Sequence, residues 1–240
     1  MRPDGRQVYD LRPINIEPEY SKYADGSALI SIGNTRVLCN MTIEEGVPKW
    51  MQLQGKSGGW LTAEYSMLPR STIIRTPRET TPGGRTMEIR RLIGRSLRTS
   101  VDLERIGALT LTLDCDVLQA DGGTRTAAIT GGYIALALGI KKQIIAGRLP
   151  IDLHLEPVAA ISVGIIDGSI VLDLNYEEDA VAEVDANFIM NSRGEFIEIQ
   201  GTAERNAFSK TTLNHMIDLA AKGIDDLFEC QKKILLAWNR

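Results

Sequence analysis

Cysteine and histidine are scarce in this sequence, with three Cys and two His among 240 residues. Cys39, Cys115 and Cys230 lie far apart in largely apolar surroundings, and no CxxC pair occurs. We therefore expect buried, reduced thiols and no disulfide framework. The two histidines, His154 and His215, are too few to build a zinc site on the usual His and Cys spacing.

Long apolar runs are also missing. The first six residues lack the apolar core of a signal peptide. The most apolar stretch, residues 133–140, is far shorter than the roughly 20 residues needed to cross a bilayer. The sequence therefore predicts a soluble, cytoplasmic protein that does not associate with a membrane.

Two common catalytic motifs are absent. The run Gly55-Lys56-Ser57 resembles the end of a phosphate-binding P-loop, but Trp50 stands where that motif requires its first glycine. No GxSxG nucleophile elbow occurs, and no well-placed histidine could serve a serine nucleophile. The sequence therefore predicts neither a P-loop protein nor a serine hydrolase.

Charge is unevenly distributed along the chain. The formal net charge of −4 alone argues against a nucleic-acid-binding protein, because such proteins are usually basic. However, eight of the 18 arginines fall between Arg70 and Arg98, and only Glu79 and Glu88 oppose them. This segment carries +6 and the rest of the chain carries −10. The asymmetry indicates a local basic surface that could bind a polyanion.

Periodicity in the sequence predicts an α+β (mixed α/β) protein with sheets packed on helices. We expect strands within 26–43, with a turn at Gly33-Asn34, and over 60–68, 109–118, 158–166, 169–176, 184–190 and 195–200. Helices are predicted over 86–103 and 124–146, and from a cap at Ser209 to about residue 237. Residues 46–59 and 69–85 are predicted to be loops. The expected organisation is a single domain over residues 1–240.

Two glycine pairs stand at the beginnings of predicted helices. The run Asp121-Gly122-Gly123-Thr124-Arg125-Thr126 combines close backbone approach, a helix N-terminus and a planar double donor, which together suit a phosphate. An ordinary strand-to-helix turn with a capping Thr124 would show the same spacing. The run Gly83-Gly84-Arg85-Thr86 repeats the pattern. Arg85 could therefore bring a second cation to the same anion, although a simple capped helix start is the alternative.

Acidic residues dominate a segment of the second half. Between residues 173 and 204 there are nine acidic residues and one basic residue. The closest-spaced members are Glu177, Glu178, Asp179, Glu183 and Asp185. Carboxylates about six positions apart could hold Mg²⁺ together with several waters. A solvated acidic loop is the alternative interpretation.

A third feature is basic. Arg91, Arg95 and Arg98 lie opposite the apolar face of the helix predicted over 86–103. They could contact an RNA backbone or a partner subunit, or simply form a solvated face. A phosphate cradle, paired carboxylates and an Arg-rich surface are together what phosphoryl transfer on nucleic acid requires. A phosphate ion acting as the nucleophile would make an activated protein nucleophile unnecessary.

Several longer motifs carry a resemblance to a known family. The most specific is Asp114-Cys115-Asp116-Val117-Leu118-Gln119-Ala120-Asp121-Gly122-Gly123-Thr124-Arg125-Thr126. Others are Arg2-Pro3-Asp4-Gly5-Arg6, Gly33-Asn34-Thr35-Arg36-Val37-Leu38-Cys39, Gly59-Trp60-Leu61-Thr62-Ala63-Glu64-Tyr65, Met67-Leu68-Pro69-Arg70-Ser71-Thr72, Gly84-Arg85-Thr86-Met87-Glu88-Ile89 and Gln200-Gly201-Thr202-Ala203-Glu204. Over nearly its whole length the sequence resembles the ribonuclease PH family.

The resemblance implies an activity and an assembly. The expected activity is that of a phosphorolytic 3′-to-5′ exoribonuclease, which trims tRNA precursors with inorganic phosphate as co-substrate and Mg²⁺ as cofactor. The products would be nucleoside 5′-diphosphates, and the reverse reaction would add nucleotides to RNA 3′ ends. The resemblance further implies a fold of two related β–α halves and a homo-hexameric ring built as a trimer of dimers.

The resemblance also implies roles for particular residues. The matches to phosphate-binding positions are Arg85, Gly123, Thr124 and Arg125. The matches to the metal-binding aspartates are Asp179 and Asp185, which with Arg85 and Arg125 form the expected catalytic set. The matches to a loop that serves subunit assembly and RNA contact are Arg70, Arg75 and Arg78, and we expect Arg91, Arg95 and Arg98 to extend this RNA-binding surface.

The competing hypothesis is an exosome-like ring subunit that binds RNA without catalysis. Such a subunit would be expected to lose phosphate or metal residues, and here none is missing. A catalytic exosome-like subunit is suggested by Arg2-Pro3-Asp4-Gly5-Arg6, whereas the run from Gly59 to Thr72 resembles ribonuclease PH more closely.

Overall fold

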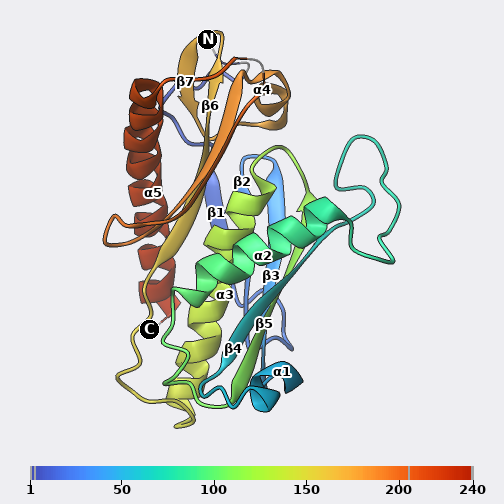
Figure 1. Ribbon diagram of the computed structural model, residues 1–240, viewed down its shortest axis with the longest axis vertical. Helices are drawn as coiled ribbons and strands as arrows, with labels where there is room; N and C mark the ends of the chain where they lie inside the picture. The colour runs from blue at the N-terminus through green and yellow to red at the C-terminus, as the bar shows by residue number, and fades with distance from the viewer. Residues whose placement is uncertain (1, 3, 205, 239–240) are drawn as a thin grey trace.

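Two β-sheets and five helices build the computed structural model, which describes residues 2, 4–204 and 206–238 (Figure 1). Pro3 of the N-terminal motif lies outside the described residues. The first sheet has the order β1-β2-β3-β5-β4, and the second has the order β7-β6-β8-β9. All strand pairs are antiparallel except β4 with β5, which is parallel.

The element bounds follow the chain. The strands are β1 (Ile14–Pro18), β2 (Gly26–Ile32), β3 (Thr35–Glu45), β4 (Trp60–Met67), β5 (Leu109–Gln119), β6 (Val158–Ile166), β7 (Ser169–Leu172), β8 (Val184–Asn191) and β9 (Phe196–Ala203). The helices are α1 (Lys49–Leu53), α2 (Gly84–Arg98), α3 (Thr124–Ile145), α4 (Tyr176–Val181) and α5 (Lys210–Trp238). The predicted α+β class is confirmed.

Local turn chemistry explains the hairpins. Gly33 has a φ of +56° between β2 and β3. Asp167 and Gly168 form the two-residue turn between β6 and β7, with φ values of +47° and +71°. A turn of this type requires both central residues to be left-handed.

Ser209 caps α5, since its hydroxyl accepts a hydrogen bond from the Thr212 N–H at 3.0 Å. The predicted turns and this cap are confirmed.

Helix α3 joins the two sheets. It is buried along most of its length and packs on β2 and β3 of the first sheet and on β6 of the second (Figure 1). Val158 and Ala160 of β6 therefore belong to the same apolar core as Ile30 and Leu113 of the first sheet. Because one core spans both sheets, burial of apolar area couples the two halves of the chain.

Three short elements differ from the sequence prediction. Helix α1 lies within the predicted loop 46–59, and β1 was not predicted. The strand expected over 169–176 ends at Leu172, and the unpredicted helix α4 begins at Tyr176. Five or six residues cover less than two helical turns, so α1 and α4 show no apolar periodicity. In α4 the decisive signal is a capping box, in which Asn175 and Glu178 each accept the other's backbone N–H.

No helix in the described part of the chain combines the length and apolarity that a membrane span requires.

Candidate active site

A polar cleft of about 80 Å³ lies where the N-termini of α2 and α3 face α4 and the second sheet. Its lining residues are Arg85, Gly123, Thr124, Arg125, Ser162, Asp179, Asp185, Ala186 and Asn187. The tertiary structure thus brings together all six residues that the sequence predicts to bind phosphate or metal, from three separate parts of the chain.

Ser162 and Asn187 in this lining were missed by sequence reasoning. They face each other in the β6–β8 register, and both side chains are buried. A buried polar residue within an otherwise apolar strand is a signal that could have identified them.

The N-terminus of α3 leaves its backbone N–H groups without a side-chain cap. Gly123 occupies the N-cap position at φ +64°, and no side chain in the described part of the chain accepts a capping hydrogen bond there. The Thr124 hydroxyl instead lies 2.9 Å from the Tyr65 hydroxyl. The alternative of an ordinary capping Thr124 therefore does not describe this helix. Unpaired N–H groups and the positive end of the helix dipole favour an anion at this point.

Two arginines flank the α3 N-terminus. Arg125 donates from Nη1 to Gln200 Oε1 at 2.9 Å and lies 3.2 Å from Glu88 Oε1. These two contacts fix the Nη1 side of the Arg125 guanidinium. The Nη2 atom has no protein partner among the described residues. Arg85, in the first turn of α2, has no ion-pair partner within the described part of the chain. Both cations are therefore available to a bound anion.

Two carboxylates form the opposite wall of the cleft. Partial burial, and then repulsion by Asp185, raise the pKa of Asp179, although Arg85 and Arg125 oppose this effect. The Asp185 Oδ1 atom is buried and has no hydrogen-bond partner among the described residues. An orphaned carboxylate oxygen beside a second carboxylate fits a divalent cation that keeps most of its waters. No group of three or more His, Cys, Asp or Glu residues that could hold a metal ion occurs in the described residues.

Comparison with family models decides the family. Residues 10–139 match the model "3' exoribonuclease family, domain 1", and residues 156–223 match domain 2 of the same family. Ribonuclease PH of Moorella thermoacetica is 52% identical over 238 residues, covering 98% of this chain and 94% of that protein. Ribonuclease PH of Bacillus subtilis is 53% identical over 239 residues, covering 98% and 97%. The chain belongs to the ribonuclease PH family.

Solved structures share the fold of this ribonuclease PH family member. Rice (Oryza sativa) Rrp46 superposes with a TM-score of 0.79 at 19% identity, covering 98% of this chain and all of that one. A subunit of the Archaeoglobus fulgidus exosome with RNA bound to the active site superposes with a TM-score of 0.81 at 19% identity, covering 95% and 91%. At this identity the likeness shows the fold alone.

The predicted RNA-binding arginines of this family member fall into two groups. Arg70, Arg75 and Arg78 are exposed on the segment between β4 and α2, which projects from the body at the right of Figure 1. On α2, Arg91 is exposed, but the other two make contacts within the chain. Arg95 pairs with Glu198 at 2.7 Å, and Arg98 stacks 4.6 Å from the Trp60 ring centroid.

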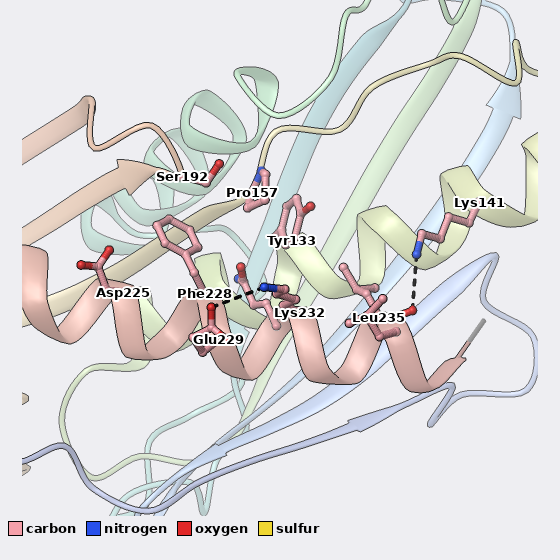
Figure 2. A pocket seen from close by; sticks show the side chains of 11 residues that line it. Tyr133, Lys141, Pro157, Ser192, Asp225, Phe228, Glu229, Lys232 and Leu235 are labelled. Atoms are coloured by element: carbon pink, nitrogen blue, oxygen red, sulfur yellow. Dashed lines mark hydrogen bonds and ion pairs between the residues drawn. The ribbon is translucent and has the colours of Figure 1, made fainter. Parts of the chain in front are cut away.

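A larger groove of about 480 Å³ lies elsewhere, between α3, α5 and the turn after β8 (Figure 2). Phe228 and Leu235 give it an apolar floor, and a Lys232–Glu229 pair lies on the same helix. None of the predicted ribonuclease PH site residues lines this groove. The smaller cleft is the candidate active site because the convergent charged groups lie there.

Gly122→Ala is expected to destabilise this ribonuclease PH fold by about 3 kcal/mol, combining a left-handed backbone with a steric clash. Gly122 has φ +75°, and an added Cβ would lie 2.6 Å from the Asn175 carbonyl carbon. The matched control is Gly107→Ala, at φ +70° with nothing within 4 Å of the added Cβ, which should cost only about 1 kcal/mol. Urea denaturation of both variants measures the difference. Equal losses of stability in the two variants would contradict a close contact between Gly122 and the backbone of residues 174–175.

Proposed function

We propose that the polar cleft is the active site for phosphorolysis of RNA from its 3′ end. As a member of the ribonuclease PH family, the chain is a phosphorolytic 3′-to-5′ exoribonuclease and tRNA nucleotidyltransferase. The observation that supports the assignment of the cleft is the meeting of two arginines and an uncapped helix N-terminus with two carboxylates. Positive groups and paired carboxylates in one cavity suit a reaction that is mostly positioning and charge neutralisation.

In the proposed reaction, inorganic phosphate is the nucleophile. Arg85, Arg125 and the backbone N–H groups after Gly123 hold the phosphate through charge-assisted hydrogen bonds. One phosphate oxygen attacks the phosphorus of the last phosphodiester, and the bond from that phosphorus to the 3′ oxygen breaks. The products are a nucleoside 5′-diphosphate and an RNA shortened by one residue. Because one phosphoryl bond replaces another, the step is reversible.

We assign the second half of the cleft to the departing oxygen and to Mg²⁺. Asp179 and Asp185 would hold the cation, whose charge would offset negative charge on the transferring group. Their fit to a cation rests on the orphaned Asp185 Oδ1 and on the charge repulsion between the two side chains. The buried Ser162 and Asn187 add neutral hydrogen-bonding groups to the same wall.

We propose that the substrates are tRNA precursors with 3′ extensions. We further propose that the protein works in the cytoplasm as a homo-hexamer built as a trimer of dimers, and that residues 1–240 act as one domain. The core shared by both sheets supports the single domain. The exposed Arg70, Arg75 and Arg78 support an RNA or subunit contact at the projecting segment. The alternative role, an exosome-like ring subunit that only binds RNA, is supported solely by a shared fold.

The test supplies a tRNA carrying extra 3′ nucleotides together with Mg²⁺, in the presence or absence of phosphate. We expect nucleoside diphosphates to appear only when phosphate is present, because phosphate is the nucleophile. Thin-layer or anion-exchange chromatography distinguishes diphosphates from monophosphates. Monophosphate products, or equal trimming without phosphate, would exclude phosphorolysis, and RNA binding without any trimming would favour the ring-subunit alternative.

A further inference from the structure

Three arginines near the N-terminus are largely buried, although none of them lines the cleft. Arg2 is 7% exposed and Arg12 is 4% exposed, and the side chain of Arg6 is 10% exposed. Their carboxylate partners, Asp173 and Glu178, are buried as well. Buried charges are tolerated only when they are paired and hydrogen-bonded with good geometry. This cluster therefore fixes the elements that contribute to it.

Arg12 connects the two loops that carry the active site. Its Nη2 donates to Asp173 Oδ1 at 2.6 Å, and its Nε donates to Asp173 Oδ2 at 3.0 Å. Its backbone N–H also donates to Asp173 Oδ2, at 2.8 Å. The remaining nitrogen, Nη1, donates to the carbonyl oxygens of Asp121 and Gly122. One guanidinium thus joins the loop that leads into α3 to the loop that leads into α4.

The two loops also touch directly. A Cβ on Gly122 would lie 2.6 Å from the Leu174 carbonyl oxygen, so the two backbones are in close contact. The Tyr176 N–H donates to Asp121 Oδ1 at 3.3 Å across the same boundary. Asp173 has φ +53°, a left-handed conformation that a non-glycine residue keeps only when its surroundings impose it. Arg12 supplies three of the contacts that hold the Asp173 side chain.

A second buried arginine, Arg2, makes paired hydrogen bonds to the first turn of α4 and to the loop before it. Arg2 donates to the two Glu178 carboxylate oxygens at 2.6 and 2.7 Å, and to the Asp173 carbonyl oxygen at 2.9 Å. Burial opposes ionisation of Glu178, but the hydrogen bonds from Arg2 and from the Asn175 N–H outweigh it and lower the pKa of this carboxyl. Glu178 directly precedes Asp179, so these paired hydrogen bonds fix the helix that carries the cleft carboxylate.

We propose that Arg12 and Asp173 are positioning residues that hold the phosphate-binding loop before α3 at its working distance from the carboxylates on α4 and β8. The proposal rests on the function assigned to the cleft above. Neither Arg12 nor Asp173 lines the cleft. Both act through the backbone of residues 121–123, whose placement sets where the α3 N–H groups point. Small displacements of such groups weaken binding and catalysis strongly.

The test measures phosphate binding separately from RNA binding in Arg12→Lys and Asp173→Asn. Lysine keeps the charge of Arg12 but cannot bond both loops at once, because it lacks the planar fork. We expect Arg12→Lys to raise the KM for phosphate about tenfold or more, with the KM for RNA changed less than about twofold. The matched control is Ile224→Val on α5, a core substitution that lowers stability at a position outside both loops.

A readout without catalysis completes the test. Inorganic phosphate alone should raise the melting temperature of the wild-type protein and of Ile224→Val, and should do so much less for Arg12→Lys and Asp173→Asn. An unchanged phosphate response in a folded Arg12→Lys variant overturns the proposal, and this variant decides the outcome if Asp173→Asn does not fold. A wild-type protein that phosphate does not stabilise would instead contradict the phosphate site itself, so the two failures are distinguishable.

Discussion

Arg125→Ala is expected to lower kcat/KM for phosphate-dependent trimming by about 10³-fold, the scale on which a cation at a transferring phosphoryl group acts. Arg125 faces the cleft at the N-terminus of α3, and among the described residues that line the cleft Arg85 is the one other cationic side chain. The fold should persist, because the Glu88 partner of Arg125 is 43% exposed and can be solvated after the substitution. The substitution should therefore lower the rate of the chemical step and weaken phosphate binding, without unfolding the protein.

Steady-state kinetics with varied phosphate and a filter-binding assay with RNA measure the two effects. RNA affinity should change little, because we assign Arg125 to phosphate. The control is Arg105→Ala, which removes an exposed arginine paired with Asp152 on the surface, and neither residue lines the cleft. Loss of RNA binding together with trimming would show that Arg125 contacts RNA and would reject its role as a phosphate ligand.

Asp185→Asn should reduce Mg²⁺-dependent trimming by about 10²-fold to 10³-fold, because it removes one of the two charged ligands that we propose for the cation while keeping the side-chain volume. The Asp185 Oδ1 atom has no hydrogen-bond partner among the described residues, so the fold does not depend on that oxygen. Phosphate binding should be retained or strengthened, since the substitution removes a negative charge from the cleft.

Calorimetric titration with Mg²⁺, and melting temperature against phosphate concentration, separate the two ligands. Glu177→Gln is the matched control: it makes the same change of charge in the same acidic segment, on an exposed side chain outside the cleft. Unaltered Mg²⁺ binding in Asp185→Asn would move the cation site elsewhere. If Glu177→Gln weakened Mg²⁺ binding as much as Asp185→Asn, both results would reflect the net charge of the acidic segment and not a ligand role of Asp185.

Much of the fold could be predicted from local sequence signals. Turns such as Asp167-Gly168 require left-handed backbone at adjacent positions, and a few residue types strongly favour it. The amphipathic face of α2 and the apolar length of α3 predicted both helices, and both ends of α3 and the start of α2 lie within two residues of the prediction. The predicted end of α2 was wrong, because the helix ends at Arg98 and not at residue 103. Helix α4 was missed because a single capping box, Asn175 with Glu178, forms it without periodicity.

The candidate site was also predicted in part from the sequence. Glycine pairs before helices indicated a phosphate, and the acidic segment indicated a metal, each with an ordinary alternative. Thr124 could have capped α3, and only the structure shows its hydroxyl beside Tyr65, a residue 59 positions away. Arg95 and Arg98 were predicted to extend an RNA-binding surface, but the structure pairs Arg95 with Glu198 of β9 and places Arg98 against Trp60 and Leu61 of β4.

The sequence by itself determined the longer helices and strands, the hairpin turns and the family, because propensity, periodicity and motifs are local or are matched along the chain. Only the tertiary structure decided which charges meet. Arg12 and Asp173 are 161 positions apart, and no local pattern predicts that they pair. Their pairing depends on the packing of two sheets around α3, and such burial has no local signature. The scarcity of histidine and cysteine is consistent with this arrangement, because the proposed chemistry relies on arginine, backbone N–H groups and carboxylates.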